Sequence, residues 1–279
     1  MNILPKAILF DLDDTLFDHR RASRLALVAM HAAYAPDLPF EAFAIKHAEV
    51  LETFHAHFLT GELTLDEARV ARLQTLFAAF DRQLDVDTLE RAARLYREQH
   101  QANRHLVTGA IELLDALRGH CRLGIVTNNS TAEQIEKLRA LNIANYFDTV
   151  VISEDVGVTK PDPKIFSIAL ESIGATAQET VFIGDNWTSD ILGARNAGMS
   201  AVWFDTNETL ISADIAEHKW PEKHASARVY DIQHIASVAS LSPAATVVAA
   251  IKTVFINRNN RTPGAEQHEQ LETLASRHR

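Results

Sequence analysis

The 279-residue sequence predicts a three-layer α/β sandwich with a central parallel sheet, interrupted by an inserted all-helical domain. The first observation is a set of short, almost wholly apolar runs, which are typical of strands that helices cover on both faces. These runs are residues 6–10, 123–126, 149–152, 180–183 and 201–204. The second observation is the stretch 17–103, which has apolar residues at helical spacings and no strand-like run.

Composition narrows the classes of function. Apolar residues make up 47% of the chain, enough for a substantial core in one large or two small domains. A formal net charge of -10 argues against a nucleic-acid binder. The single cysteine, Cys121, excludes an intramolecular disulfide and is expected to be an inert thiol. We expect no signal sequence, because the first expected strand begins within ten residues of Met1, and the apolar stretch 244–256 is too short to span a bilayer. We therefore expect a cytoplasmic enzyme with no nucleic-acid or membrane partner.

Two carboxylates follow the first expected strand, residues 6–10. Asp11 should lie at the carboxyl end of this strand, where open α/β sheets bind their ligands. Asp13, two residues later, should lie in the loop above it. Two carboxylates this close repel each other unless a cation or a shared proton lies between them, so the pair predicts a metal site. The ordinary alternative is a polar strand-to-helix turn with capping residues.

Polar residues also follow the second expected strand, residues 123–126. Thr127 and Asn128 come directly after the run 123–126. By themselves they indicate an Asn-rich turn before a helix that Ser130 or Thr131 caps, and this structural role can coexist with a role in binding.

A lysine and two further acids complete the polar residues near strand ends. Lys160 lies in a loop that neighbouring prolines stiffen, although most lysines are solvated surface charges. Asp185 follows the run 180–183 in the way that Asp11 follows the first strand. Asp190 could be an ordinary acid in the first turn of a helix, where the helix dipole favours it.

In their order along the chain, these residues resemble the four motifs of the haloacid dehalogenase superfamily. The motifs are Asp11-x-Asp13-x-Thr15, Thr127-Asn128, Lys160-Pro161 and Gly184-Asp185 with Asp190. Four motifs in the correct order are far more specific than any one of them. The resemblance covers roughly residues 6–241 and implies a Rossmann-like core with a small helical cap, the C1 type.

The resemblance assigns each residue a role in phosphoryl transfer. Asp11 is implied as the nucleophile and Asp13 as the general acid and base. The groups implied to bind phosphoryl oxygens are Lys160, the hydroxyl of Thr127 and the N–H of Asn128. The implied cofactor is Mg²⁺, whose ligands would be the carboxylates of Asp11 and Asp185 and the carbonyl of Asp13. Thr15 and Asp190 are implied to orient these ligands without binding the ion.

The resemblance also divides the chain. Residues 1–16 and 106–242 are the expected catalytic core, and 17–105 are the expected cap. Residues 243–279 are expected to be a partly disordered C-terminal extension, with a packed or peripheral helix at 244–256. A closing helix is expected at 230–241.

The run 183–204 resembles the pyrimidine 5'-nucleotidase branch, and N-acylneuraminate 9-phosphatases share much of it. We therefore expect hydrolysis of a small phosphomonoester, first a pyrimidine nucleoside 5'-monophosphate. The alternatives are a sugar phosphatase such as N-acylneuraminate 9-phosphatase, a phosphoglycolate phosphatase, and, after these, a 2-haloacid dehalogenase, a phosphomutase or a non-catalytic binding module. Four cap residues, Arg20, Arg21, Arg24 and Arg72, could meet the substrate, but solvated helix faces are the plainer interpretation. The sequence predicts no oligomeric state.

Overall fold

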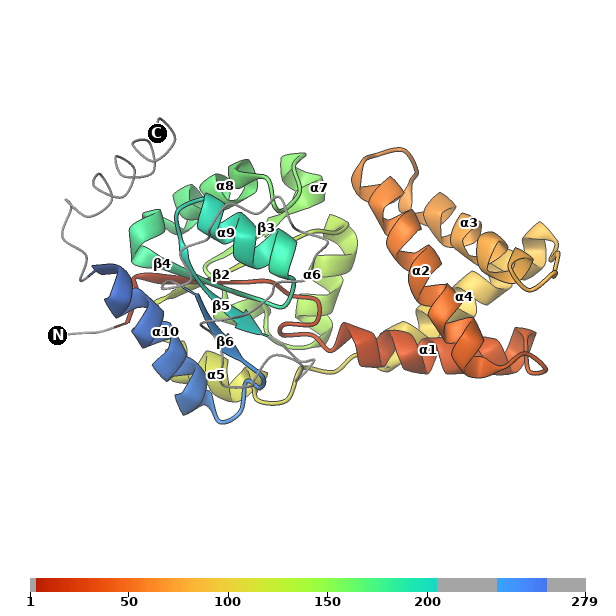
Figure 1. The fold of residues 1–279 in the computed structure, drawn as a ribbon, viewed down its shortest axis with the longest axis horizontal. Helices are drawn as coiled ribbons and strands as arrows, with labels where there is room; N and C mark the ends of the chain where they lie inside the picture. Colours follow the sequence, from red (N-terminus) through yellow and green to blue (C-terminus); the bar gives the residue numbers. More distant parts are fainter. Residues whose placement is uncertain (1–3, 205–234, 260–279) are drawn as a thin grey trace, which may run out of the picture.

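The computed structural model describes residues 4–204 and 235–259, drawn in colour in Figure 1. Six strands form one parallel sheet in the order β3-β2-β1-β4-β5-β6. Their bounds are β1 Ala7–Phe10, β2 Arg122–Thr127, β3 Thr149–Ile152, β4 Thr180–Gly184, β5 Ser200–Phe204 and β6 Ile235–Val238. All five predicted strands are confirmed, and so is the fold class. Because β1 lies between β2 and β4, the strand order reverses beside it, which is where open α/β sheets bind ligands.

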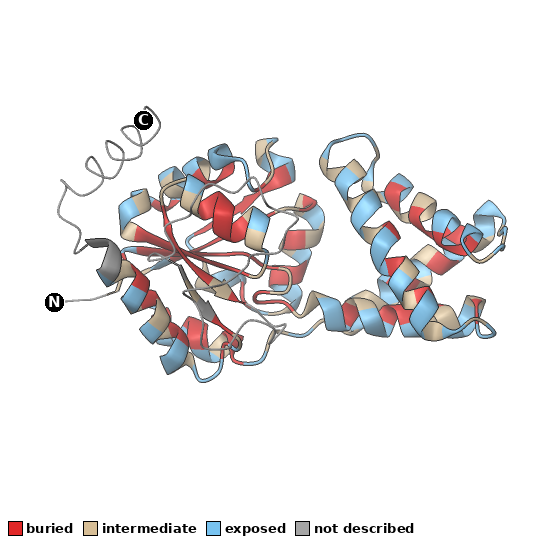
Figure 2. Ribbon diagram, viewed as in Figure 1, coloured by how far each residue is buried: buried red, intermediate tan, exposed pale blue. Residues whose placement is uncertain are grey.

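Each face of the sheet has its own hydrophobic core. In β1, Ile8 and Phe10 pack into the cluster that contains α5 and α10, whereas Ala7 and Leu9 pack into the cluster that contains α8. The helices of this part are α5 Ala110–Leu117, α6 Thr131–Ala140, α7 Ser153–Val156, α8 Pro163–Ile173, α9 Gly193–Asn196 and α10 Ala244–Asn259, with short turns at Ala144–Tyr146 (η1), Ala177–Glu179 (η2) and Trp187–Leu192 (η3). Figure 2 shows buried residues along the strands and on the helix faces turned toward them. The sheet is covered on both faces, as its apolar runs predicted.

The C-terminal part of the described chain differs from expectation. The closing helix expected at 230–241 is wrong over 235–238, where β6 pairs with β5, and residues 230–234 lie outside the described residues. A run of four residues is compatible with either element, and the free edge of β5 favours the strand. Helix α10 contributes Val247, Ile251 and Val254 to the core, each at most 1% exposed. The expected helix at 244–256 is therefore a packed one, and the disorder expected further along concerns residues 260–279, which are not described.

Four helices, α1 His19–Tyr34, α2 Phe40–Leu59, α3 Leu65–Ala78 and α4 Val86–Ala102, form a bundle with a hydrophobic cluster of its own. Side chains that accept backbone N–H groups begin three of them: Asp18 for α1, Thr64 for α3 and Asp85 for α4. The all-helical insertion is thus present. The expected domain boundaries stay a prediction. None of the described helices has the length and apolar character needed to cross a membrane.

Two neighbouring chain segments connect the bundle to the sheet, as Figure 1 shows to the right of the core. The N–H of Asp18 donates to the carbonyl of His105 at 2.9 Å, so the outgoing and returning segments pair. Arg104 forms an ion pair with Glu136 of α6 at 3.0 Å. The bundle therefore lies on the side of the sheet where β1 ends.

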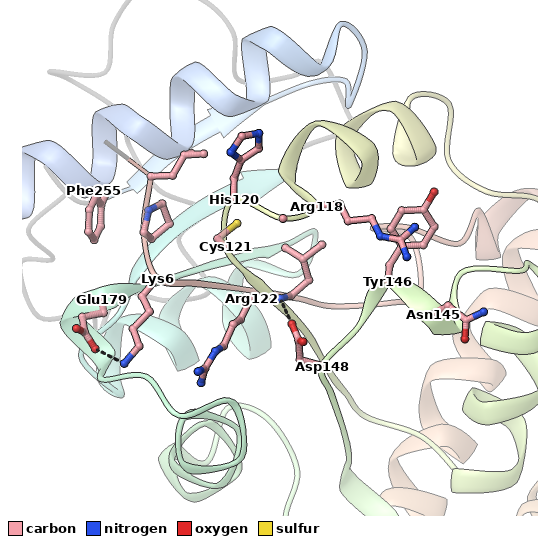
Figure 3. Close-up of a pocket in the computed structure, with 14 residues that line it drawn as sticks. Lys6, Arg118, His120, Cys121, Arg122, Asn145, Tyr146, Asp148, Glu179 and Phe255 are labelled. Atoms are coloured by element: carbon pink, nitrogen blue, oxygen red, sulfur yellow. Dashed lines mark hydrogen bonds and ion pairs between the residues drawn. The ribbon is translucent and has the colours of Figure 1, made fainter. Parts of the chain in front are cut away.

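A groove of about 820 Å³ opens at the opposite edge of the sheet, beside the start of β1 (Figure 3). Its lining includes Cys121 and the ion pair between Lys6 and Glu179. Burial raises the pKa of the Cys121 thiol to about 12, so the thiol is protonated at neutral pH and matches the inert cysteine expected from the sequence.

Candidate active site

The carboxyl ends of β1 and β4 bring together acids that are far apart in the sequence. Asp11 and Asp185 directly follow these two neighbouring strands, and the N–H of Asp11 donates to the carbonyl of Ile183 at 2.9 Å. A third acid, Asp190, comes from the π-helical turn that follows β4. One carboxylate oxygen from each of the three acids lies within 4.8 Å of those of the other two. Three of the residues singled out in the sequence thus form one cluster.

Lys160 lies against this cluster and is 5% exposed. Its ammonium is 2.5 Å from Asp11 Oδ1 and 2.6 Å from Asp190 Oδ1. Burial alone would favour the neutral amine, but the two carboxylates raise the pKa of Lys160 above its ordinary value, so the lysine stays charged. Asn128 fixes the loop that carries it: the Asn128 amide donates to the Lys160 carbonyl at 2.9 Å and accepts the Lys160 N–H at 2.8 Å. Lys160 is therefore a held charge, not a solvated surface lysine.

Asp190 is only 1% exposed, so it is not an ordinary surface acid of a first turn. Its Oδ2 accepts the N–H of Asn186 at 3.0 Å. A Cβ on Gly184 would collide with the Asp190 carboxylate, so glycine at that position allows the close approach. These two features hold Asp190 against Lys160.

The second acid of the first motif, Asp13, faces a different partner. The ammonium of Lys137 lies 2.7 and 2.8 Å from its two carboxylate oxygens. Gln134 donates to Asp13 Oδ2 at 3.2 Å and to the hydroxyl of Thr127 at 2.7 Å. Burial favours the neutral acid, but Lys137 outweighs it and holds the pKa of Asp13 well below its usual range. The structure thus links Asp13 to Thr127 through Gln134.

Lys137 and Gln134 were not expected at the site from the sequence. Both are polar residues of α6, and both are buried. They are three residues apart and so share one face of the helix, and this helix starts directly after the Thr127-Asn128 motif. That spacing was the available signal.

Asp14 and Arg20 also adjoin the acidic cluster. Arg20 lies 3.4 Å from Asp14 and 3.2 Å from Asp185, so this arginine pairs with acids of the site. Burial raises the pKa of Asp14 to about 6, against the opposing effect of Arg20. Thr15 is fully buried and its hydroxyl has no hydrogen-bond partner among the described residues. Its expected supporting role stays a prediction.

The cluster has the chemistry of a site for a hard divalent cation. Its donors are carboxylate oxygens, which Mg²⁺ prefers. Burial and the neighbouring charges of Asp190 and Asp14 raise the pKa of Asp185 to about 7, because Lys160 and Arg20 do not neutralise all the negative charge. An added dication would relieve that repulsion. The residues therefore fit Mg²⁺, while the choice of ligands among Asp11, Asp13, Asp185 and Asp190 stays a prediction.

The sequence of residues 5–198 matches the model of the haloacid dehalogenase-like hydrolase family, and this range contains every site residue described above. The chain belongs to the haloacid dehalogenase-like hydrolases. The match confirms the family that the four motifs indicated, and with it an enzyme of a hydrolase family.

This haloacid dehalogenase-like hydrolase resembles curated relatives over most of its length. It is 35% identical over 202 residues to glyceraldehyde 3-phosphate phosphatase from Pyrococcus abyssi, with coverage of 71% of this chain and 81% of the relative. It is 34% identical over 204 residues to pyrimidine 5'-nucleotidase YjjG from Escherichia coli, with coverage of 72% and 86%. A solved structure of the Bacillus subtilis HAD-hydrolase YfnB bound to magnesium aligns with a TM-score of 0.68 and 25% identity, covering 88% of this chain and 99% of that one.

Proposed function

We propose that this chain hydrolyses small phosphomonoesters with Mg²⁺ as cofactor, by transfer of the phosphoryl group to Asp11. The observation that carries the proposal is Lys160, a buried ammonium 2.5 Å from Asp11 and beside the Asp185–Asp190 cluster. A cation fixed next to a carboxylate nucleophile can neutralise the charge that develops on phosphoryl oxygens. The relatives named as phosphatases support this chemistry.

The side chains divide the reaction into two displacements. Bound Mg²⁺ would supply positive charge for the phosphoryl oxygens at Asp11 and Asp185. Asp11 attacks phosphorus, the bond from phosphorus to the leaving oxygen breaks, and an aspartyl phosphate forms. Asp13 can protonate the leaving oxygen only in its protonated form, whereas its ionised form, which Lys137 favours, takes a proton from the water that hydrolyses the aspartyl phosphate. Lys137 favours the second step because it stabilises ionised Asp13.

Phosphoryl oxygens need hydrogen-bond donors as well as cations. By the family resemblance, the Thr127 hydroxyl, the Asn128 N–H and Lys160 take this role. Thr127 Oγ1 accepts a hydrogen bond from Gln134, which leaves its own O–H free to be donated. A 2-haloacid dehalogenase, the alternative enzyme with the same aspartate nucleophile, requires neither a metal nor an acid at position 13. The acidic cluster and Asp13 therefore favour phosphoryl transfer over dehalogenation.

For the substrate, we propose a small phosphorylated metabolite, because the helical bundle lies on the side of the sheet where the site opens and would obstruct a folded phosphoprotein. The Escherichia coli relative supports the expected pyrimidine nucleoside 5'-monophosphate. The Pyrococcus abyssi relative supports the second candidate, a sugar or triose phosphate.

The proposal is tested with p-nitrophenyl phosphate and the full chain. We expect Mg²⁺-dependent release of nitrophenolate that EDTA abolishes, and loss of several orders of magnitude in kcat for Asp11→Asn, since an amide cannot form the acyl phosphate. The matched control is Asp162→Asn at an exposed helix N-cap, where asparagine caps equally well. Metal-independent halide release from 2-chloropropionate, with no phosphatase activity, would show that the chain is a dehalogenase instead.

A further inference from the structure

A buried arginine in the helical bundle lacks the anionic partner that its burial demands. Arg72 of α3 is 8% exposed, and it is the one arginine among the described residues in the buried class. Its Nε has no hydrogen-bond partner, and no described carboxylate forms an ion pair with it. Glu133, whose charge reaches Arg72, is itself paired with Arg69. A solvated helix face is the plainer interpretation of Arg72 from the sequence, and its burial contradicts that interpretation.

The contacts that Arg72 does make offset only part of the cost of burial. Its guanidinium lies 5.0 Å from the centroid of the Tyr96 ring, a cation–π contact. Such a contact stabilises a desolvated cation by less than burying its charge costs. The bundle thus holds a charge whose favourable partner must come from outside these helices.

A second unpartnered polar group lies beside the same tyrosine. His47 of α2 is 4% exposed and its Nε2 has no hydrogen-bond partner among the described residues. Its ring centroid is 5.2 Å from that of Tyr96. Two nitrogen-bearing side chains from different helices therefore contact one aromatic ring, and neither Arg72 Nε nor His47 Nε2 has an acceptor among the described residues. This is the donor set that an anionic oxygen requires.

A series of ring contacts leads from this place to the catalytic acid. Tyr96 stacks on His100 with centroids 6.4 Å apart, and His100 Nε2 is 3.3 Å from His19 Nδ1. His100 also packs on Phe17, whose ring lies 5.2 Å below the ammonium of Lys137.

His55 connects the two ends electrostatically, because the charges of both Asp13 and Arg72 act on its imidazole. The side chain of His55 is itself half-buried. Arg72 and the ammonium of Lys137 therefore lie at the two ends of one series of ring contacts.

We propose that Arg72, together with His47, binds a second anionic group of the substrate, a carboxylate or a second phosphate, at the end remote from the transferred phosphoryl group. This inference rests on the proposed phosphomonoesterase activity. It favours phosphorylated acids and bisphosphates over pyrimidine nucleoside monophosphates, whose uracil or thymine base is uncharged at neutral pH. Among the candidates from the sequence, phosphoglycolate and N-acylneuraminate 9-phosphate carry the required carboxylate.

The test compares pairs of substrates that differ only in the second anion. The carboxylate arm is 2-phosphoglycolate against 2-hydroxyethyl phosphate, and the phosphate arm is glucose 1,6-bisphosphate against glucose 6-phosphate. In one arm, the wild-type ratio of kcat/KM should favour the anionic member. Arg72→Met should lower that ratio roughly 100-fold, as expected when one partner of a buried charge pair is removed. The arm that responds identifies the anion.

Two controls separate this role from a structural one. Arg91→Met, at an exposed arginine of α4 that contacts Thr88, should leave both ratios unchanged. Arg72→Met should melt no lower than wild type, because methionine removes an unpaired buried charge and keeps the apolar stem. A variant with an unchanged ratio overturns the inference, whether its melting temperature falls or not. So does a wild-type preference for the neutral member of both pairs.

Binding without turnover keeps the inference separate from the proposed function. Calorimetry with Mg²⁺ should show that phosphonoacetate binds more tightly than methylphosphonate, and that Arg72→Met removes the difference. If p-nitrophenyl phosphate is not hydrolysed but this difference is found, the proposed function fails and the anion site stands. If p-nitrophenyl phosphate is hydrolysed, the two phosphonates bind alike and Arg72→Met changes neither substrate ratio, the anion site fails and the phosphatase stands.

Discussion

Helix α10 offers a matched pair of isoleucines that tests whether the chain after residue 242 belongs to the catalytic core. Ile251 is 0% exposed and packs in the cluster beneath β1, whereas Ile256 is 37% exposed on the same helix. Replacing either with alanine makes the same change in helix propensity, so a difference between the variants isolates burial. Ile251→Ala should cost about 3 kcal/mol, within the range of roughly 2–5 kcal/mol for a buried isoleucine truncated to alanine.

For a chain of this size, a loss of 3 kcal/mol corresponds to a fall of about 6–12 °C in melting temperature. Circular dichroism during thermal unfolding is the assay, with Ile256→Ala expected within about 2 °C of wild type. Equal melting temperatures for the two variants would refute the packing described for α10. They would also favour the expectation that the C-terminal extension from residue 243 lies outside the core.

Two further predictions concern charges near the site. Lys137→Met should lower kcat about 10- to 100-fold, because Asp13 loses its cation. The variant should also shift the acid limb of the pH–kcat profile to higher pH, since the pKa of Asp13 rises. The exposed control is Lys164→Met, and a Lys137→Met profile that matches this control would count against the pairing. Burial lowers the pKa of His47 from 6.5 to about 3, so the folded chain favours the neutral imidazole and stability is lost as pH falls from 6.5 toward 3. At pH 5 this loss is about 2 kcal/mol. The urea midpoint of His47→Gln should therefore fall less between pH 7 and pH 5 than that of wild type, and equal falls would contradict the shift.

The sequence was informative wherever a side chain follows a buried strand. Asp11 and Asp185 come directly after apolar runs, and parallel strands place such residues at one edge of the sheet. Two residues that are far apart in the sequence, but that each follow a strand, could therefore be predicted to lie close together in space. Lys160 was found in a different way, by its place in the Lys160-Pro161 motif of the family resemblance, because a lysine in a loop is by itself usually a solvated surface charge.

Residues on helices were harder to interpret, because burial of a polar helix face depends on tertiary packing. Lys137 and Gln134 look like the solvated face of an amphipathic helix until the loop after β1 is placed against them. Arg72 likewise looks solvated until α2 and α4 cover it. Strand β6 was missed for a different reason: four residues are too short to show a period, and pairing with β5 decides their conformation.

Trapping the phosphorylated enzyme tests the central claim that Asp11 is the nucleophile. The Asp13→Asn variant suits this measurement, because nitrophenolate leaves without a proton, whereas attack by water needs the base that the variant lacks. Mixing this variant with p-nitrophenyl phosphate and Mg²⁺ should release a burst of nitrophenolate equal to the enzyme concentration. After an acid quench, peptide mass spectrometry should find one phosphoryl group on Asp11. Absence of the burst, or a phosphoryl group on another residue, would contradict the assignment.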